Sequence, residues 1–175
     1  VAVNNGTAAL RASLAMLGVG SGDEVISTPF TFIATNTAIL EQGAKPVFAD
    51  IKYEDLNIDP QSIKKHITSK TKAIMIVHYG GNPCDLDEIR EIGKKHNLPV
   101  IEDSAHALGS MYKGDYIGAK ADIACFSLQV VKIINSGDGG LISTSNLEYY
   151  DKLRKIIWYG RDRDAKKTSL LDPLP

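Results

Sequence analysis

The chain has 175 residues, of which 43% are hydrophobic and 23% are charged, and its formal net charge at pH 7 is −1. These values are typical of one ordinary globular domain, and the mixture of charges excludes a basic surface for nucleic acid or a long charged tail. No apolar run reaches the length of a membrane span, and the distant cysteines Cys84 and Cys125 indicate free thiols in a reducing compartment, with neither a disulfide framework nor a zinc site.

Helix and strand patterns alternate along the chain. In order, we expect a helix over 6–20, a strand over 23–28, a helix over 30–43, a strand over 44–51, a helix over 59–67, a strand over 71–78, a helix over 84–97, strands over 98–103, 121–128 and 139–144, and a helix over 145–160. The alternation and the short connections predict an α/β fold, with a mostly parallel, mixed sheet in a three-layer α/β/α arrangement.

Local patterns support some of these elements in particular. Asp85 with Glu88, and Ser145 with Glu148, have the spacing of a capping box at the start of a helix. The continuous apolar run of 71–78 predicts a strand that is buried on both faces of the sheet.

Ligands bind at the carboxyl ends of the strands in sheets of this kind, so we searched the residues that follow each strand. Asp103 ends an apolar strand, Glu102 precedes it and His106 follows three residues later. Adjacent residues of an extended strand point to opposite faces, so Glu102 and Asp103 are a poor pair of metal ligands and we expect no metal site. Asp103 alone fits equally well as the N-cap of a following short helix.

The stretch Gly6-Thr7-Ala8 opens the first expected helix after a polar turn. Free N–H groups and the positive end of the helix dipole suit a phosphate at such a position. The alternative is an ordinary helix start that is capped by Asn5 or Thr7, and neither a Walker A pattern nor G-x-G-x-x-G is present.

Lys132 lies between an apolar strand and a glycine-rich turn in the segment FSLQVVKIINSGDGG. A lysine amine can form a Schiff base with a carbonyl compound such as pyridoxal phosphate (PLP). Binding of PLP also requires an anion site for its phosphate and a carboxylate that keeps its ring nitrogen protonated. Lys132, the helix start at Gly6 with Ser127, and Asp103 are all expected at neighbouring strand ends. Their joint placement favours a PLP site over an ordinary surface lysine.

Six segments resemble, in order, the motifs of the DegT family of PLP-dependent nucleotide-sugar aminotransferases, which are fold type I PLP enzymes. The segments cover nearly the whole chain and read NGTAAL, GSGDEVISTPFTFIATNTAI, PVFADIKYEDLNIDP, VIEDSAHALGSMYKG, FSLQVVKIINSGDGG and RKIIWYGRDR. One such motif would be unspecific, whereas six in the right order are highly specific. The resemblance implies the large domain of the PLP-transferase fold.

The resemblance also implies roles for particular residues. Lys132 corresponds to the lysine that forms the Schiff base and moves a proton between the substrate and cofactor carbons. Asp103 corresponds to the carboxylate that faces the pyridine nitrogen. Ser127, with the backbone amides of Thr7 and Ala8, corresponds to the phosphate site.

Phe32 corresponds to the aromatic residue that stacks on the cofactor ring. His106 replaces the usual glutamine that contacts the ring oxygen, and a histidine can donate there too. Leu128 and Asp138 are mild departures from the family pattern. His78 is expected to be mainly loop structure near the site.

The expected function is therefore transfer of an amino group from an amino acid such as glutamate to a keto sugar carried on a nucleotide, in amino-sugar and polysaccharide biosynthesis. We expect a cytoplasmic homodimer that binds small molecules and neither nucleic acid nor a membrane. The alternatives are a PLP-binding regulatory or sensory protein and an inactive truncated homologue. A sugar 3-dehydratase of the same family is disfavoured, because the resemblance implies a histidine in place of Lys132 in those enzymes.

Family members are longer than this chain. We therefore expect residues 1–160 to form the PLP-binding large domain, incomplete at its N-terminus. Residues 161–175 are expected to form a loop that leads to a C-terminal small domain lying beyond this sequence.

Overall fold

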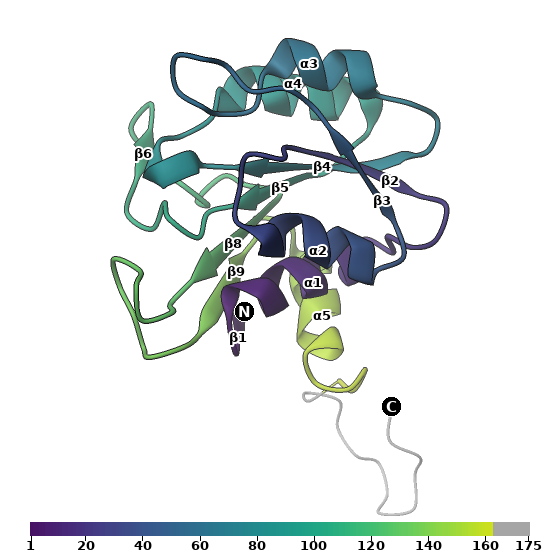
Figure 1. Cartoon of the computed structure of the whole chain (residues 1–175). Helices are drawn as coiled ribbons and strands as arrows, with labels where there is room; N and C mark the ends of the chain where they lie inside the picture. The colour runs from purple at the N-terminus through teal and green to yellow at the C-terminus, as the bar shows by residue number, and fades with distance from the viewer. Residues whose placement is uncertain (163–175) are drawn as a thin grey trace, which may run out of the picture.

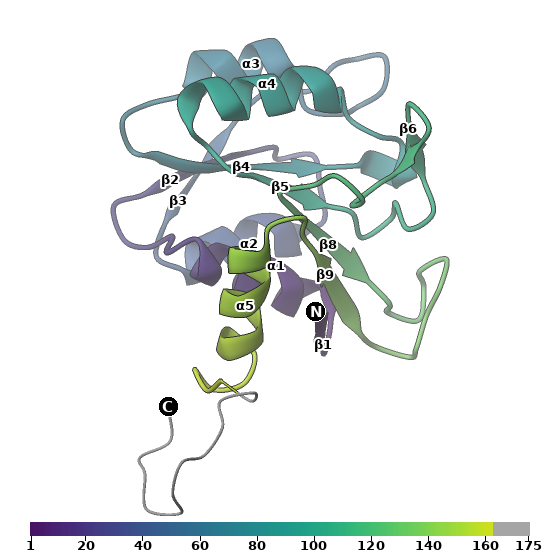
Figure 2. The same cartoon turned by 180° about the vertical axis from the view of Figure 1, so that it is seen from behind.

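The computed structural model describes residues 1–162 and has the predicted three layers, with helices on both faces of a central sheet (Figure 1). One face is covered by α1 (Gly6–Met16), α2 (Ile33–Glu41) and α5 (Leu147–Ile156), and the other by α3 (Pro60–His66) and α4 (Leu86–His96) (Figure 2). Most of the loop predicted over 161–175 lies outside the described residues. Among residues 1–162, no helix combines the length and the apolar character needed to cross a bilayer.

The central sheet has seven strands in the order β1-β9-β8-β5-β4-β2-β3. Their bounds are Ala2–Val3 (β1), Glu24–Ser27 (β2), Lys45–Phe48 (β3), Thr71–Val77 (β4), Val100–Asp103 (β5), Ile123–Ser127 (β8) and Gly140–Ser143 (β9). From β3 to β8 every neighbouring pair is parallel, whereas β9 runs antiparallel to both β8 and β1. The predicted mixed, mostly parallel sheet is thus confirmed.

Three short elements were not predicted. They are the hairpin of β6 (Met111–Tyr112) and β7 (Asp115–Tyr116), the edge strand β1, and the 3-10 turn η1 (Tyr79–Gly81). Two or three residues are too few to show a hydrophobic period, so the sequence pattern carries no signal for them.

The core forms two apolar clusters, one on each face of the sheet. Along β4 successive residues alternate between them: Ala73 and Met75 pack under α1 and α2, while Ile74 and Ile76 pack under α3 and α4. This alternation is the period of an extended strand, and it confirms that β4 is buried on both faces. The helices thereby fix the sheet from both sides and hold the carboxyl ends of its strands in place.

The capping box predicted for α4 is wrong. Asp85 occupies the N-cap position, but its side chain makes no capping hydrogen bond. Its carboxylate instead pairs with Lys52 Nζ at 2.6 Å, so a long-range ion pair replaces the local bond.

The capping box predicted for α5 is also wrong. Asn146 is the N-cap, and its Oδ1 accepts from the backbone N–H groups of Glu148 and Tyr149. The Ser145 hydroxyl donates to the carbonyl oxygen of Ala121 in the adjoining loop. The helix therefore starts one residue later than the box requires.

Candidate active site

A cavity of about 600 Å³ lies where the carboxyl ends of β4, β5 and β8 meet the N-terminal ends of α1 and α2. Seven of the predicted site residues line it: Gly6, Thr7, Phe32, Asp103, His106, Ser127 and Lys132. Residues from four separate segments of the sequence are thus brought to one place by the order of the strands. Ala8 is the exception among the predicted residues, because it lines a different cavity on the outer side of α1.

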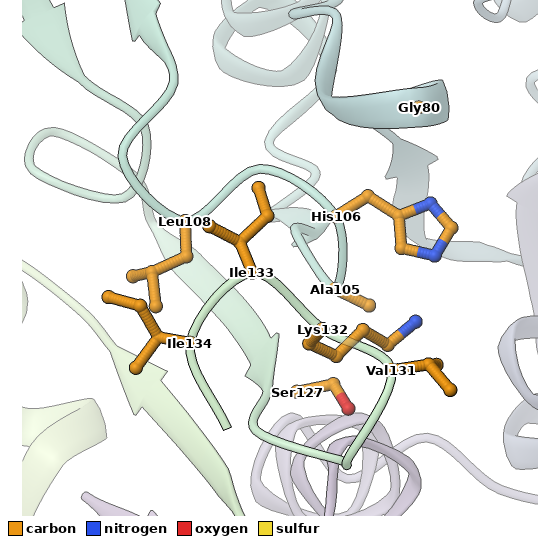
Figure 3. A pocket seen from close by; sticks show the side chains of 9 residues that line it. All are labelled: Gly80, Ala105, His106, Leu108, Ser127, Val131, Lys132, Ile133 and Ile134. Carbon is orange, nitrogen blue, oxygen red and sulfur yellow. The ribbon is translucent and has the colours of Figure 1, made fainter.

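Lys132 is carried by the loop between β8 and β9. Among the described residues its amine has no hydrogen-bond or ion-pair partner, so the nitrogen is available to a ligand. In Figure 3 the Lys132 amine and the His106 ring lie on the same side of the loops that carry them. Partial burial lowers the pKa of His106, and the nearby positive charge of Lys132 lowers it further. Neutral imidazole is therefore favoured beside the amine.

A second cavity of about 210 Å³ adjoins the first and shares Lys132, His106 and Ser127 with it (Figure 3). Its remaining wall is mostly apolar and includes Leu108, Ile133 and Ile134. The side chain of Lys132 thus borders both cavities, and both are lined mostly by apolar surface.

Asp103 is the last residue of β5, and its carboxylate is buried, with only 7% of the residue exposed. Oδ2 accepts from the hydroxyl of Thr35 at 2.7 Å, and Oδ1 accepts from the N–H of Ala105 at 3.2 Å. Burial raises the pKa of Asp103, and the two hydrogen bonds oppose this rise. A buried carboxylate at a cavity wall, held only by neutral hydrogen-bond donors, can accept a further bond from a cationic N–H group.

Thr35 and Thr31 were missed by the sequence analysis. Thr35 is fully buried on α2, and its Oγ1 lies 2.8 Å from that of Thr31, which lines the cavity. Thr31 lies just before the N-cap Phe32, and Thr35 lies in the first turn of α2, so the start of the helix brings their hydroxyls together. Nothing local in the sequence indicated that this face meets Asp103.

The N-terminal end of α1 packs directly against Ser127. A Cβ added at Gly6 would lie 2.9 Å from Ser127 Cβ, which is too close for any residue with a side chain. Asn5 caps the helix, since its Oδ1 accepts from the N–H of Ala8 at 2.8 Å. The Ala8 amide is thus already engaged, whereas Gly6 and Thr7 border the cavity together with Ser127. This narrow, glycine-lined corner suits a small anion.

Phe32 is the N-cap residue of α2 and is 75% exposed, so its ring is not part of the core. Its place on the cavity wall agrees with contact to a flat ligand. An exposed large aromatic ring at a cavity is otherwise unexplained by packing.

His78 is more than the loop structure that we expected, because it is completely buried at the end of β4. Its Nδ1 accepts from the N–H of Cys84 at 3.1 Å, so the proton of the neutral ring is on Nε2, which donates to Glu102 Oε2 at 3.2 Å. Glu102 Oε1 accepts from Arg90 at 3.0 Å on the same face.

Glu102 and Asp103 thus point to opposite faces, as predicted. No group of three or more metal-ligating side chains occurs within residues 1–162.

Comparison with known proteins identifies related chains. The model of the DegT/DnrJ/EryC1/StrS aminotransferase family matches residues 1–171. The spore coat polysaccharide biosynthesis protein SpsC of Bacillus subtilis is 44% identical over 165 residues, which are 94% of this chain and 42% of SpsC.

Two solved structures share the fold. The structure of DesI in the presence of its TDP-sugar product matches with a TM-score of 0.88 and 34% identity, over 93% of this chain and 41% of DesI. The structure of NtdA from Bacillus subtilis with bound cofactor PMP matches with a TM-score of 0.87 and 33% identity, over 98% of this chain and 39% of NtdA. The chain spans less than half the length of the curated relatives that it matches.

Proposed function

Because the chain belongs to the DegT/DnrJ/EryC1/StrS aminotransferase family, we propose that the protein is a PLP-dependent aminotransferase that acts on a keto sugar carried on a nucleotide. The observation that carries the proposal is the meeting of Lys132, Asp103 and the glycine corner of α1 at one cavity. The sugar nucleotide is supported by the product named for DesI, and the pathway by the polysaccharide role named for SpsC.

The residues present fit PLP at each of its polar groups. The unpaired amine of Lys132 suits the aldehyde, the carboxylate of Asp103 suits a protonated ring nitrogen, and the corner formed by Gly6, Thr7 and Ser127 suits the phosphate. Phosphate binding by the Ala8 amide would require it to give up the bond to Asn5. When bound, PLP would supply a ring that withdraws electrons from the substrate carbon bearing the amino group.

Each side chain then has a definite task. The Lys132 amine would hold the cofactor, and once released its Nζ would be the base that takes a proton from the substrate carbon and the acid that returns it. Asp103 would keep a proton on the ring nitrogen by its negative charge. Phe32 would stack on the ring, and His106 would donate a hydrogen bond to the ring oxygen.

The amino donor is proposed to be glutamate, and the working unit a cytoplasmic homodimer. These assignments derive from the family resemblance. The two buried free thiols, Cys84 and Cys125, are compatible with a reducing compartment.

The first test is spectroscopic. Addition of PLP to the chain should give a visible absorbance band, and borohydride should then fix the cofactor covalently on Lys132. Lys132→Ala should abolish both, whereas Lys113→Ala, at an exposed lysine paired with Asp87, should leave both unchanged. A wild-type chain with neither band nor trapped lysine would refute the cofactor assignment for this chain.

The second test separates an enzyme from a PLP-binding sensor. Incubation of the PLP-loaded protein with glutamate should release 2-oxoglutarate in an amount that grows with time when a keto sugar nucleotide is present. Release of a single equivalent, with no further turnover for any keto sugar nucleotide tried, would favour the sensory alternative.

A further inference from the structure

Two threonine hydroxyls and a carboxylate form a series of hydrogen bonds that runs from the cavity wall into the protein. Thr31 lines the cavity, its Oγ1 lies 2.8 Å from Thr35 Oγ1, and Thr35 Oγ1 lies 2.7 Å from Asp103 Oδ2. Thr35 is fully buried, so water cannot replace it as a partner of the carboxylate. These hydrogen bonds link α2 to the end of β5.

The number of protons available decides which group donates and which accepts in each of these hydrogen bonds. An ionised carboxylate only accepts hydrogen bonds, so the single hydroxyl proton of Thr35 must go to Asp103. Thr35 can then only accept from Thr31, which uses the single hydroxyl proton of Thr31. Only a proton on Oδ2 itself would reverse both hydroxyls. With Asp103 ionised, both hydroxyl dipoles point toward its negative charge.

We propose that Thr35, with Thr31 behind it, is a positioning residue that holds Asp103 ionised and directed at the cavity. The inference builds on the proposed function, in which Asp103 faces a protonated ring nitrogen. Thr35 is fully buried and is not part of the cavity wall, so it would act through Asp103.

The other titratable groups around Asp103 do not replace this contact. Just after β4, His78 donates its backbone N–H to the Asp103 carbonyl oxygen, and on β8 Cys125 lies opposite Asp103 in the register. His106 follows on the same loop and acts on Asp103 only through its charge. Burial raises the pKa of Cys125 to about 12, so the thiol stays neutral. Among these neighbours, Thr35 and the Ala105 amide alone donate to the carboxylate within residues 1–162.

The test is a titration of Asp103 in the chain without cofactor, followed through its carboxyl carbon resonance, which is assigned by its loss in Asp103→Asn. In Thr35→Val the titration midpoint should lie about one pH unit higher than in wild type, since a hydrogen bond to a charged group is lost. Thr35→Ser keeps the hydroxyl and should restore the wild-type midpoint. Thr31→Val should raise the midpoint by a smaller amount, because it acts at the outer end of the chain.

Thr37→Val is the matched control. Thr37 lies on the same helix, and its hydroxyl donates only to the backbone oxygen of Ala34, so its variant should titrate like wild type. The affinity for PLP should fall about tenfold in Thr35→Val and recover in Thr35→Ser.

A midpoint in Thr35→Val equal to that of wild type would overturn the inference, and so would a Thr35→Ser midpoint that stays raised. If Thr35→Val does not fold, Thr31→Val tests the same series of hydrogen bonds from the cavity side. An unchanged titration midpoint of Asp103 in Thr31→Val would then overturn the inference. Raised midpoints in a chain that traps no PLP would refute the proposed function while leaving the role of Thr35 supported.

Discussion

Glu102 and Asp103 are adjacent carboxylates on one strand, and both are buried, yet they are held in different ways. Glu102 accepts from Arg90, a cation, and from His78, so its charge is neutralised within the chain. Asp103, on the opposite face, accepts from a hydroxyl and a backbone amide, which are both neutral.

The difference distinguishes a carboxylate that is paired with a cation inside the fold from one that can still bind a cationic ligand group. A buried charge that is paired with a cation joins the layers of the fold and has little capacity left for a ligand. A buried charge held by neutral donors costs stability, and it can regain that stability by pairing with a cationic ligand group. The cavity lies on the side of Asp103, where this second arrangement occurs.

The largest expected effect comes from breaking the structural side at His78. His78→Leu leaves Glu102 Oε2 without a donor and the Cys84 N–H without an acceptor, both in a fully buried position. We expect a loss of about 3 kcal/mol in the free energy of unfolding, measured by urea titration. His96→Leu, at an exposed histidine on α4, is the control, and a similar small loss for both variants would contradict the structural role of His78.

A smaller loss is expected on removing the cation of the same network. Arg90→Met keeps much of the apolar stem but removes the donor to Glu102 Oε1, and should cost about 2 kcal/mol in the same experiment. Lys64→Met breaks the exposed pair with Glu88 and should cost much less, because solvent screens that pair. Equal losses would mean that the burial of Glu102 does not matter.

The smallest effect is expected for Asp103→Asn, and here the free energy of unfolding should increase. Because burial raises the pKa of Asp103, the folded chain without cofactor binds more protons than the unfolded chain between the ordinary aspartate pKa and the raised one. Stability therefore falls as the pH rises through that window. Asp103→Asn mimics the protonated form, since its amide can donate to Thr35 and its oxygen can accept from Ala105. The variant should match wild type at acidic pH and exceed it at neutral pH.

Urea titrations of the two proteins across this pH range measure the difference. The same variant should bind PLP more weakly, so stability and binding would move in opposite directions. A variant that is less stable than wild type at neutral pH would contradict the view that the charge of Asp103 is a cost in the chain without cofactor.

Most of the fold could be predicted from the sequence because local residue patterns indicate most of its helices and strands. The apolar run of β4 and the glycine after α1 mark their elements through residues that are neighbours in the chain. The predicted capping boxes failed at Asp85 and Ser145 because each side chain found a partner far along the sequence, Lys52 and Ala121. Rules based on the spacing of nearby residues cannot predict such distant partners.

The candidate site shows the same division. Lys132, Asp103 and Ser127 could be predicted as candidate site residues because the sequence shows both their chemical type and their position at or just after the end of a strand. The bond of the Ala8 amide to Asn5 and the burial of His78 were not predicted, because each depends on which neighbour takes the hydrogen bond.

By itself, the sequence determined the alternation of strands and helices, the residues at the strand ends and the motifs of the family. The tertiary structure alone decided which partner each buried charge receives. Strand alternation sends Glu102 and Asp103 to opposite faces, but only the packing of α4 brings Arg90 to one and only the packing of α2 brings Thr35 to the other. A long-range contact depends on the relative placement of whole elements, and that placement decides which of two adjacent carboxylates faces the cavity with neutral donors alone.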